Sequence, residues 1–191
     1  MSIETILGIA VGIGLSAACG FRVFVPLLVM NLASLTGHLH LAPGFEWIGN
    51  YYATVAFATA TIVEVLGYYI PWLDHILDLI ASPAAIIAGT IVTASMVMGM
   101  SPFLKWTLAI IAGGGAATIV QGTTVALRTK SSALTAGTGN FLVSSAELAG
   151  SVMTALLAII VPILCLILLA LLSISVIWKV GRLFFGRIKI T

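Results

Sequence analysis

The sequence predicts an all-α integral membrane protein with about six transmembrane helices, arranged as two inverted three-helix repeats. The chain of 191 residues is 61% hydrophobic and 7% charged, with a mean hydropathy of +1.22, whereas soluble domains carry roughly 25% charged residues. Apolar runs long enough to cross a bilayer recur along the chain. A stripe of small residues near the N-terminus also has a counterpart later in the sequence.

The first apolar run, residues 6–35, is longer than the roughly 20 residues that cross a bilayer. Four small residues recur at every fourth position of this run: Gly8, Gly12, Ser16 and Gly20. On a helix they form one smooth stripe that another backbone can approach closely. We expect the run to tilt, to protrude or to break near Gly20 or Pro26.

The later spans are predicted from apolar runs that polar or proline-containing turns separate. The expected spans are residues 51–70, 83–100, 107–127 and 141–178, the last of them divided into two at Pro162. A short interfacial helix is expected near residues 72–80, and Ser82 and Pro83 are expected to begin the next span as its cap and first residue. Residues 128–139 are predicted to be a polar loop.

A gapless shift of 102 residues aligns two parts of the chain. It places Gly12, Ser16, Gly20 and Arg22 on Gly114, Thr118, Gly122 and Thr124, and Thr36-Gly37-His38 on Thr138-Gly139-Asn140. Three spans per repeat is an odd number, so the second copy would be inverted, as in many small transporters. The prediction is one membrane domain over 1–191, with repeats at 5–100 and 107–178 and a basic tail at 179–191. A plain six-helix bundle with two glycine-rich seams is the alternative.

Three ionisable residues fall inside the predicted spans: Arg22, Glu64 and Glu147. Each costs about 2.5–3.5 kcal/mol at a helix centre unless it is paired or hydrated. Glu64 lies seven residues before Pro71 and Glu147 seven residues after Asn140, so both lie about 10 Å from the same end of the bundle. We expect a cluster centred on Arg22 with one acid left over, which would hold a proton or accept a cation. The alternative is a static salt bridge that fixes helix packing.

The candidate substrate- or ion-binding residues are these charges, the glycine at the expected break and polar residues of the second repeat. They are Arg22, Glu64, Glu147, Gly20, Thr124 and Asn140. Asp74, His75 and Asp78 are weak candidates for a divalent metal by residue type, and a solvated face of an interfacial helix is the favoured interpretation. No Ser/His/Asp or Cys/His arrangement indicates an enzyme, and we expect no cofactor. The net charge of +2 without a basic stripe predicts no nucleic-acid partner.

The orientation is predicted from the basic residues outside the spans. One side of a six-span bundle holds Arg128, Lys130, Lys179, Arg182, Arg187 and Lys189, and the other holds Lys105. This imbalance predicts a plasma (bacterial inner) membrane protein with both termini, the Asp74/Asp78 segment and the 128–139 loop in the cytoplasm. The glycine stripes of so small a chain also predict a homo-oligomer.

Three motifs follow one another in a distinctive order. They are Gly-Leu-Ser-x-x-x-Gly-x-Arg22-x-Phe-x-Pro26-Leu-Leu, Glu64-x-x-Gly67-x-x-Ile-Pro71-Trp72-x-Asp74-x-x-x-Asp78, and Thr-x-Gly-x-Gly-Asn140 with Glu147 after it. This order resembles the bacterial membrane family called domain of unknown function 4126 (DUF4126). The resemblance implies a small multi-pass membrane protein and no particular activity. Family members often carry Asp-Lys where Tyr68-Tyr69 stand here, which implies a difference in substrate or in coupling.

The favoured hypothesis is a small inverted-repeat transporter or channel for a small solute or ion, proton-coupled through its intramembrane Glu and Arg residues. An anionic or zwitterionic solute would meet Arg22. The alternative is a non-transporting protein that assembles partners or organises the lipid bilayer, with a dry, fully paired charge cluster and no cavity open to either side. Lipid translocation along a polar groove is a third hypothesis.

Overall fold

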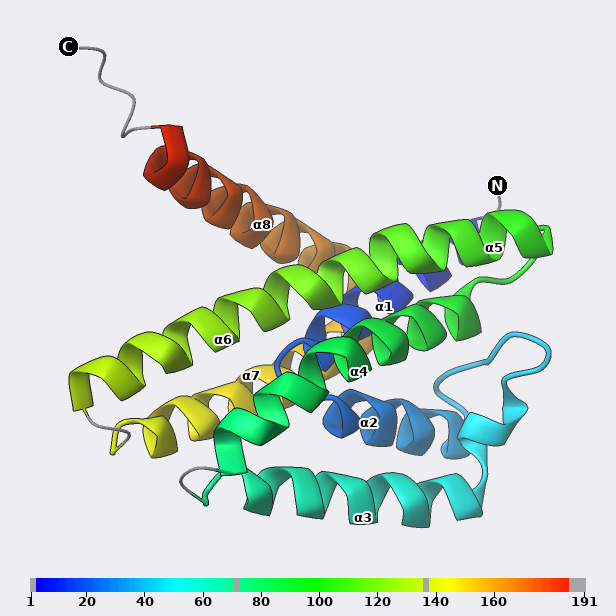
Figure 1. Ribbon diagram of the computed structural model, residues 1–191. Helices are drawn as coiled ribbons and strands as arrows, with labels where there is room; N and C mark the ends of the chain where they lie inside the picture. The colour runs from blue at the N-terminus through cyan, green and yellow to red at the C-terminus, as the bar shows by residue number, and fades with distance from the viewer. Residues whose placement is uncertain (1–2, 71–72, 136–137, 186–191) are drawn as a thin grey trace.

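The computed structural model describes residues 3–70, 73–135 and 138–185, and the regular elements of this part are all helical. They are α1 (Ile3–Cys19), α2 (Phe24–Leu35), η1 (Glu46–Gly49), α3 (Tyr51–Gly67), α4 (Leu73–Met96), α5 (Pro102–Leu108), η2 (Ala109–Gly114), α6 (Gly115–Thr135), α7 (Asn140–Ile160) and α8 (Pro162–Phe185). In Figure 1, α1, α2 and α4 lie between helix α3 and the run from α5 to α6, and α8 extends beyond α6.

The predicted helical membrane character agrees with the lengths of these helices. Among the described residues, three runs are long and apolar enough to cross a membrane: Ile76–Met96, Pro102–Thr135 and Asn140–Ile160. Three further apolar helices are shorter, namely Ile3–Cys19, Phe24–Leu35 and Tyr51–Gly67, and α8 is apolar over Pro162–Trp178. The chain therefore combines long helices with shorter ones.

Helix α1 is the central helix because its small residues let neighbouring backbones come close. A Cβ atom added at Gly8 would lie 2.5 Å from the carbonyl oxygen of Met96. Two turns later, the Ser16 hydroxyl donates a hydrogen bond of 2.5 Å to the carbonyl oxygen of Gly89. The predicted stripe is thus the contact between α1 and an antiparallel α4.

The chain breaks directly after this stripe. Helix α1 ends at Cys19 and α2 begins at Phe24, and a Cβ atom at Gly20 would lie 2.5 Å from the carbonyl oxygen of Ala117 in α6. In Figure 1, α1 runs into the middle of the molecule and α2 turns back toward the side from which α1 came. Of the outcomes expected for this run (tilting, protrusion, or a break near Gly20 or Pro26), the structure shows the break near Gly20, with Pro26 inside α2. Residues 6–35 form a helical hairpin in place of one span.

This hairpin changes which ends of the chain lie together. The start of α1 lies against Met96 at the end of α4, whereas Asp78 lies near the start of α4. The N-terminal end of α1 and Asp78 are therefore at opposite ends of the bundle. The prediction that the N-terminus and the Asp74/Asp78 segment share one side is wrong, because it counted residues 6–35 as one complete crossing.

Helix α4 is longer than expected. It runs unbroken from Leu73 to Met96 with Pro83 inside it, so a separate interfacial helix over 72–80 and a new helix at Pro83 are both wrong (Trp72 lies outside the described residues). A proline inside a helix removes one backbone hydrogen bond. Nearby, the Ser82 hydroxyl donates to the carbonyl oxygen of Asp78 at 2.8 Å, so Ser82 lies within the helix and does not cap a new one.

Helix α6 also extends beyond its predicted end. It continues to Thr135 through most of the predicted loop of residues 128–139. The hydroxyls of Thr129 and Thr135 donate to the carbonyl oxygens of Val125 and Ser131 at 2.8 and 2.7 Å. Hydroxyls that bond to the preceding turn are accommodated within a helix, so a Ser/Thr-rich stretch need not be a loop.

The two halves differ in where their helices are interrupted. Gly122, which the 102-residue shift pairs with Gly20, lies inside the unbroken α6. The same shift places α3 on residues 153–169, where the chain divides at Val161 between α7 and α8. The predicted division of residues 141–178 at Pro162 is confirmed, since α8 begins there.

Candidate functional site

Arg22 lies at the break between α1 and α2 with 2% of its surface exposed. Its Nη2 atom donates to the carbonyl oxygen of Ser144 at 3.1 Å and lies 3.4 Å from Oε2 of Glu147. Both partners belong to the first turns of α7. The structure therefore brings Arg22 and Glu147 together, as the sequence leads us to expect.

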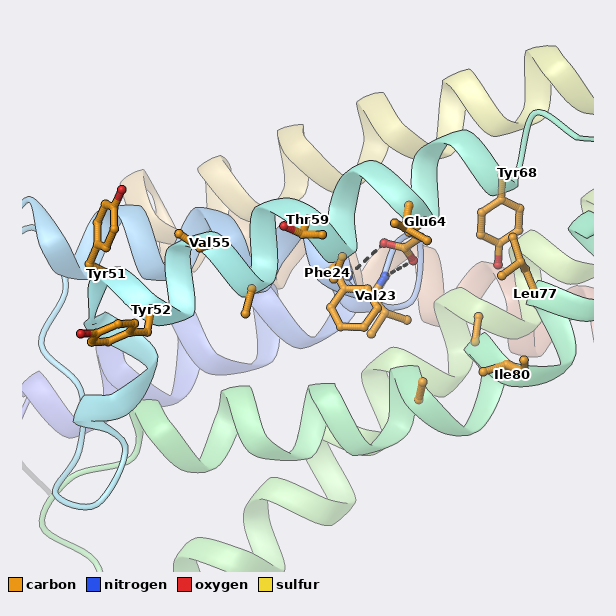
Figure 2. Close-up of a pocket in the computed structure, with 15 residues that line it drawn as sticks. Val23, Phe24, Tyr51, Tyr52, Val55, Thr59, Glu64, Tyr68, Leu77 and Ile80 are labelled. Atoms are coloured by element: carbon orange, nitrogen blue, oxygen red, sulfur yellow. Dashed lines mark hydrogen bonds between the residues drawn. The ribbon is translucent and has the colours of Figure 1, made fainter.

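Glu64 binds the hairpin in a different way. Its carboxylate accepts hydrogen bonds from the backbone N–H groups of Val23 at 2.7 Å and Phe24 at 3.1 Å (Figure 2). These N–H groups stand at the N-terminus of α2, where the backbone lacks intrahelical acceptors and the helix dipole favours negative charge. Glu64 is thus not the unpaired acid that the sequence leads us to expect. It caps the second half of the hairpin from α3.

Arg128 is a cluster member that the sequence reasoning missed. It is buried in α6, where it pairs with Glu147 and, through Nη1 and Oδ1 at 3.3 Å, with Asp78. The interpretation of Arg128 as a cytoplasmic loop residue is wrong because α6 continues past it. Gln121, Thr124 and Arg128 are all buried, and their i, i+3, i+7 spacing is the sequence signal of one polar helix face.

Tyr68 contacts both arginines at the end of α3. The guanidinium carbons of Arg22 and Arg128 lie 3.8 and 4.2 Å from the centroid of its ring. The negative face of an aromatic ring attracts cations at such distances. Tyr68 therefore helps to hold two like charges in one buried cluster, and it stands where the family resemblance expects a charged residue.

The cluster is balanced in charge but not fully hydrogen-bonded. Within the described part of the chain, the Nε atoms of Arg22 and Arg128, Nη1 of Arg22 and Oε1 of Glu147 have no hydrogen-bond partner. A buried polar group left in this state costs about 1–3 kcal/mol. These atoms are therefore available to hydrogen-bond a ligand or water that reaches the cluster.

The other predicted site residues have structural contacts. Gly20 packs on α6, and the buried Thr124 donates to the carbonyl oxygen of Gln121 at 2.9 Å. The Asn140 amide donates to the Ser132 hydroxyl at 2.8 Å. Asp78 pairs with Arg128, in disagreement with a solvated face. The side chains of Asp74 and His75 lie outside the described residues, and the described ones contain no group of three or more His, Cys, Asp or Glu side chains that could hold a metal.

A cavity of about 850 Å³ lies between α3 and α4 beside the cluster. Glu64 and Tyr68 lie at one end of it and Tyr51 and Tyr52 at the other, as Figure 2 shows. The side chains between these ends are almost all apolar. The cavity thus has one end at the α1–α2 break and a long apolar wall.

The sequence of the chain matches one protein-family model over most of its length. The model of the family described as Domain of unknown function (DUF4126) matches residues 9–182. The chain belongs to this family. The DUF4126 match includes most of the hairpin, both buried arginines and the acids that pair with them. No curated protein and no solved structure matches the chain, so the geometry of the site carries the functional argument.

Proposed function

We propose that this DUF4126 protein transports a small anionic or zwitterionic solute across a membrane, with its binding site at the α1–α2 break. The observation that carries this proposal is that several guanidinium N–H groups of the buried Arg22 and Arg128 have no hydrogen-bond partner among the residues that the structure describes. Guanidinium groups present planar, paired donors that match carboxylate and phosphate oxygens. A solute with such a group would satisfy these donors.

The hairpin supports a transport role. Helices α1 and α2 are short and meet inside the bundle, beside three long helices. Transporters commonly build their sites from interrupted helices whose N-termini point at anionic groups of the substrate. Here the N-terminus of α2 already binds a carboxylate, that of Glu64.

Glu64 offers a way to couple transport to protons. While ionised, it occupies the N–H groups that an anionic substrate would use. A proton on Glu64 would remove its negative charge and weaken this cap, which leaves the α2 N-terminus free to accept the solute. Entry of the solute would then require a proton, and release of the proton would restore the cap.

The proposed orientation follows from the hairpin. We propose that α1 and α2 enter and leave a plasma membrane on one side, the side of the α4–α5 turn. Lys130 lies near the end of α6, at the other end of the bundle, and the positive-inside rule favours that end for the cytoplasm. The inverted repeat and a homo-oligomer remain predictions, and the two small-residue stripes support them.

A second candidate function has its own supporting observation. Arg22, Arg128 and Glu147 are each at most 4% exposed and pair with one another. A buried, paired cluster is also what a non-transporting assembly protein would use to fix its helix packing. Such a protein would use the cavity and the exposed apolar helices to bind membrane partners.

Flux through liposomes tests the transport proposal. We would reconstitute the full chain and measure uptake of radiolabelled phosphate, succinate and glycine under an inward proton gradient. At least one probe should enter faster than into empty liposomes. Glu64→Gln, Glu147→Gln and Arg22→Ala should each slow that uptake at least tenfold, while the exposed Glu46→Gln should not. Uptake equal to that of empty liposomes would contradict transport. Unchanged uptake in all three variants would contradict the proposed mechanism, with its site at the α1–α2 break and its coupling through Glu64.

A further inference from the structure

We propose that the cavity between α3 and α4 binds a long-chain carboxylate, with its acidic head at the N-terminus of α2 and its single acyl chain along the apolar wall. This inference rests on the proposed function, since the same helix break would hold the anionic group. It goes further in naming an amphipathic substrate class that enters from the bilayer.

The head site is one that already holds a carboxylate. Val23 and Phe24 line the cavity, and their backbone N–H groups bind Glu64 at 2.7 and 3.1 Å. A ligand carboxylate would replace that of Glu64 with the same two hydrogen bonds. Arg22 directly precedes them in the chain, is 2% exposed and has two unpartnered nitrogen atoms among the described residues. Arg22 is not part of the cavity lining, and it would supply the compensating charge once the Tyr68 ring that covers it moves aside.

The rest of the cavity suits an acyl chain. Tyr52 and Glu64 both line it and lie twelve residues apart on α3, which corresponds to about 18 Å at 1.5 Å per residue. The wall between them consists mainly of small and aliphatic side chains: Val55, Ala56, Ala60, Val63, Ile80 and Ala81. A hydrophilic solute would gain nothing from this surface, whereas a long acyl chain would bury its length there.

Tyr68 lies between the cavity and the arginines. It lines the cavity, and its ring packs on the guanidinium groups of Arg22 and Arg128. A rotation of this side chain would open the arginines to a head group already seated at the α2 N-terminus. Tyr68 therefore acts as the gate through which the anion passes from the cavity to the cluster.

Photo-crosslinking tests where the ligand lies. The full chain in lipid nanodiscs would be exposed to palmitate that carries a photoactivatable group near its methyl end. Crosslinks should form on residues 51–56, and unlabelled palmitate should reduce them at least tenfold more effectively than hexadecanol, which has the same tail without the charge. Acetate should not compete. Equal competition by hexadecanol would overturn the proposal, because the head site would then contribute nothing.

Matched tryptophan variants test the cavity itself. Ala60→Trp fills the cavity and should abolish the crosslinks, whereas Ile62→Trp, at an exposed position outside the lining, should leave them unchanged. Ala56→Trp is a second blocking variant in case the first does not fold. Glu64→Gln should raise palmitate affinity severalfold, because it removes the competing charge. Undiminished crosslinking in the folded blocking variants would contradict the assignment.

The outcomes separate this inference from the transport proposal. Crosslinks in the cavity without flux of any probe, palmitate included, would leave a lipid-binding site and contradict transport. Uptake of phosphate or succinate without crosslinks would support transport and contradict the amphipathic substrate.

Discussion

The two small-residue stripes of the chain are similar in sequence and differ in the fold. At Gly20, an added Cβ atom would meet the backbone of α6 at 2.5 Å, and the helix ends there. At Gly122, a Cβ atom would have no neighbour within 4 Å, and α6 continues for more than three turns. A glycine thus permits another backbone to come close, but the fold places a neighbouring backbone only at Gly20 and not at Gly122.

Both stripes nevertheless lead to the same place. Arg22 follows the first stripe at a helix break, and Arg128 follows the second within an unbroken helix. Both arginines lie in the buried charge cluster. Glu147 pairs with both arginines, whereas Glu64 caps only the break. Substitutions that affect both the α1–α2 break and α6, or only one of them, can therefore distinguish the contributions of these two regions to stability.

Glu147→Gln should have the largest effect, because it removes the acid common to both regions. Loss of one partner from a buried ion pair leaves uncompensated charge and typically destabilises by about 3–5 kcal/mol. Thermal unfolding of the purified chain in detergent would show this as a large fall in the midpoint. Glu46→Gln, at an exposed acid, should leave the midpoint unchanged. A Glu147→Gln midpoint equal to that of the wild type would show that the pairs contribute nothing.

Gly20→Ala should disturb only the first region. Its Cβ atom would lie 2.6 Å from that of Val120 as well as close to the α6 backbone, and such overpacking costs about 1–3 kcal/mol. The same unfolding measurement should record the loss. If this variant had the same unfolding midpoint as the wild type, α1 and α6 would not be in close contact.

Glu64→Ala tests the cap of α2 alone. Loss of a capping side chain with its favourable charge at a helix N-terminus costs about 1–2 kcal/mol. Amide hydrogen exchange should increase in the first turn of α2 and remain unchanged in α6. Equal increases in both helices would mean that Glu64 supports the whole bundle and not the break.

Gly122→Ala should have the smallest effect and the opposite sign. Because the added methyl group meets open space, the substitution should stabilise α6 by about 0.5–1 kcal/mol through the greater helix propensity of alanine. A rise in the unfolding midpoint would support the contrast with Gly20. A fall would show that a partner, such as a second copy of the chain, covers Gly122.

The sequence predicted the helical class, the division at Pro162 and the meeting of Arg22 with Glu147, and it offered a break near Gly20 as one of several outcomes for a long first run. Each of these has a local cause in glycine spacing, proline chemistry or the cost of buried charge. The sequence did not predict Arg128 or Tyr68 as cluster members. Arg128 follows an apolar run and precedes a Ser/Thr-rich stretch, a composition that helices and loops share. Tyr68 carries no charge, so only its position between two arginines distinguishes it. The orientation failed for a different reason, since hydropathy cannot tell a long span from a hairpin.

The π-helical turn η2 gives Arg128 an unusual sensitivity to chain length. A π-helical turn closes its hydrogen bonds one residue later than an α-helical turn, and η2 lies directly before α6. Each residue of a helix corresponds to about 100° of rotation, and Arg128 lies about four turns beyond Gly114. Deletion of a single residue within Ala109–Gly114 would therefore turn the polar face of α6 away from Glu147 without altering any charged side chain.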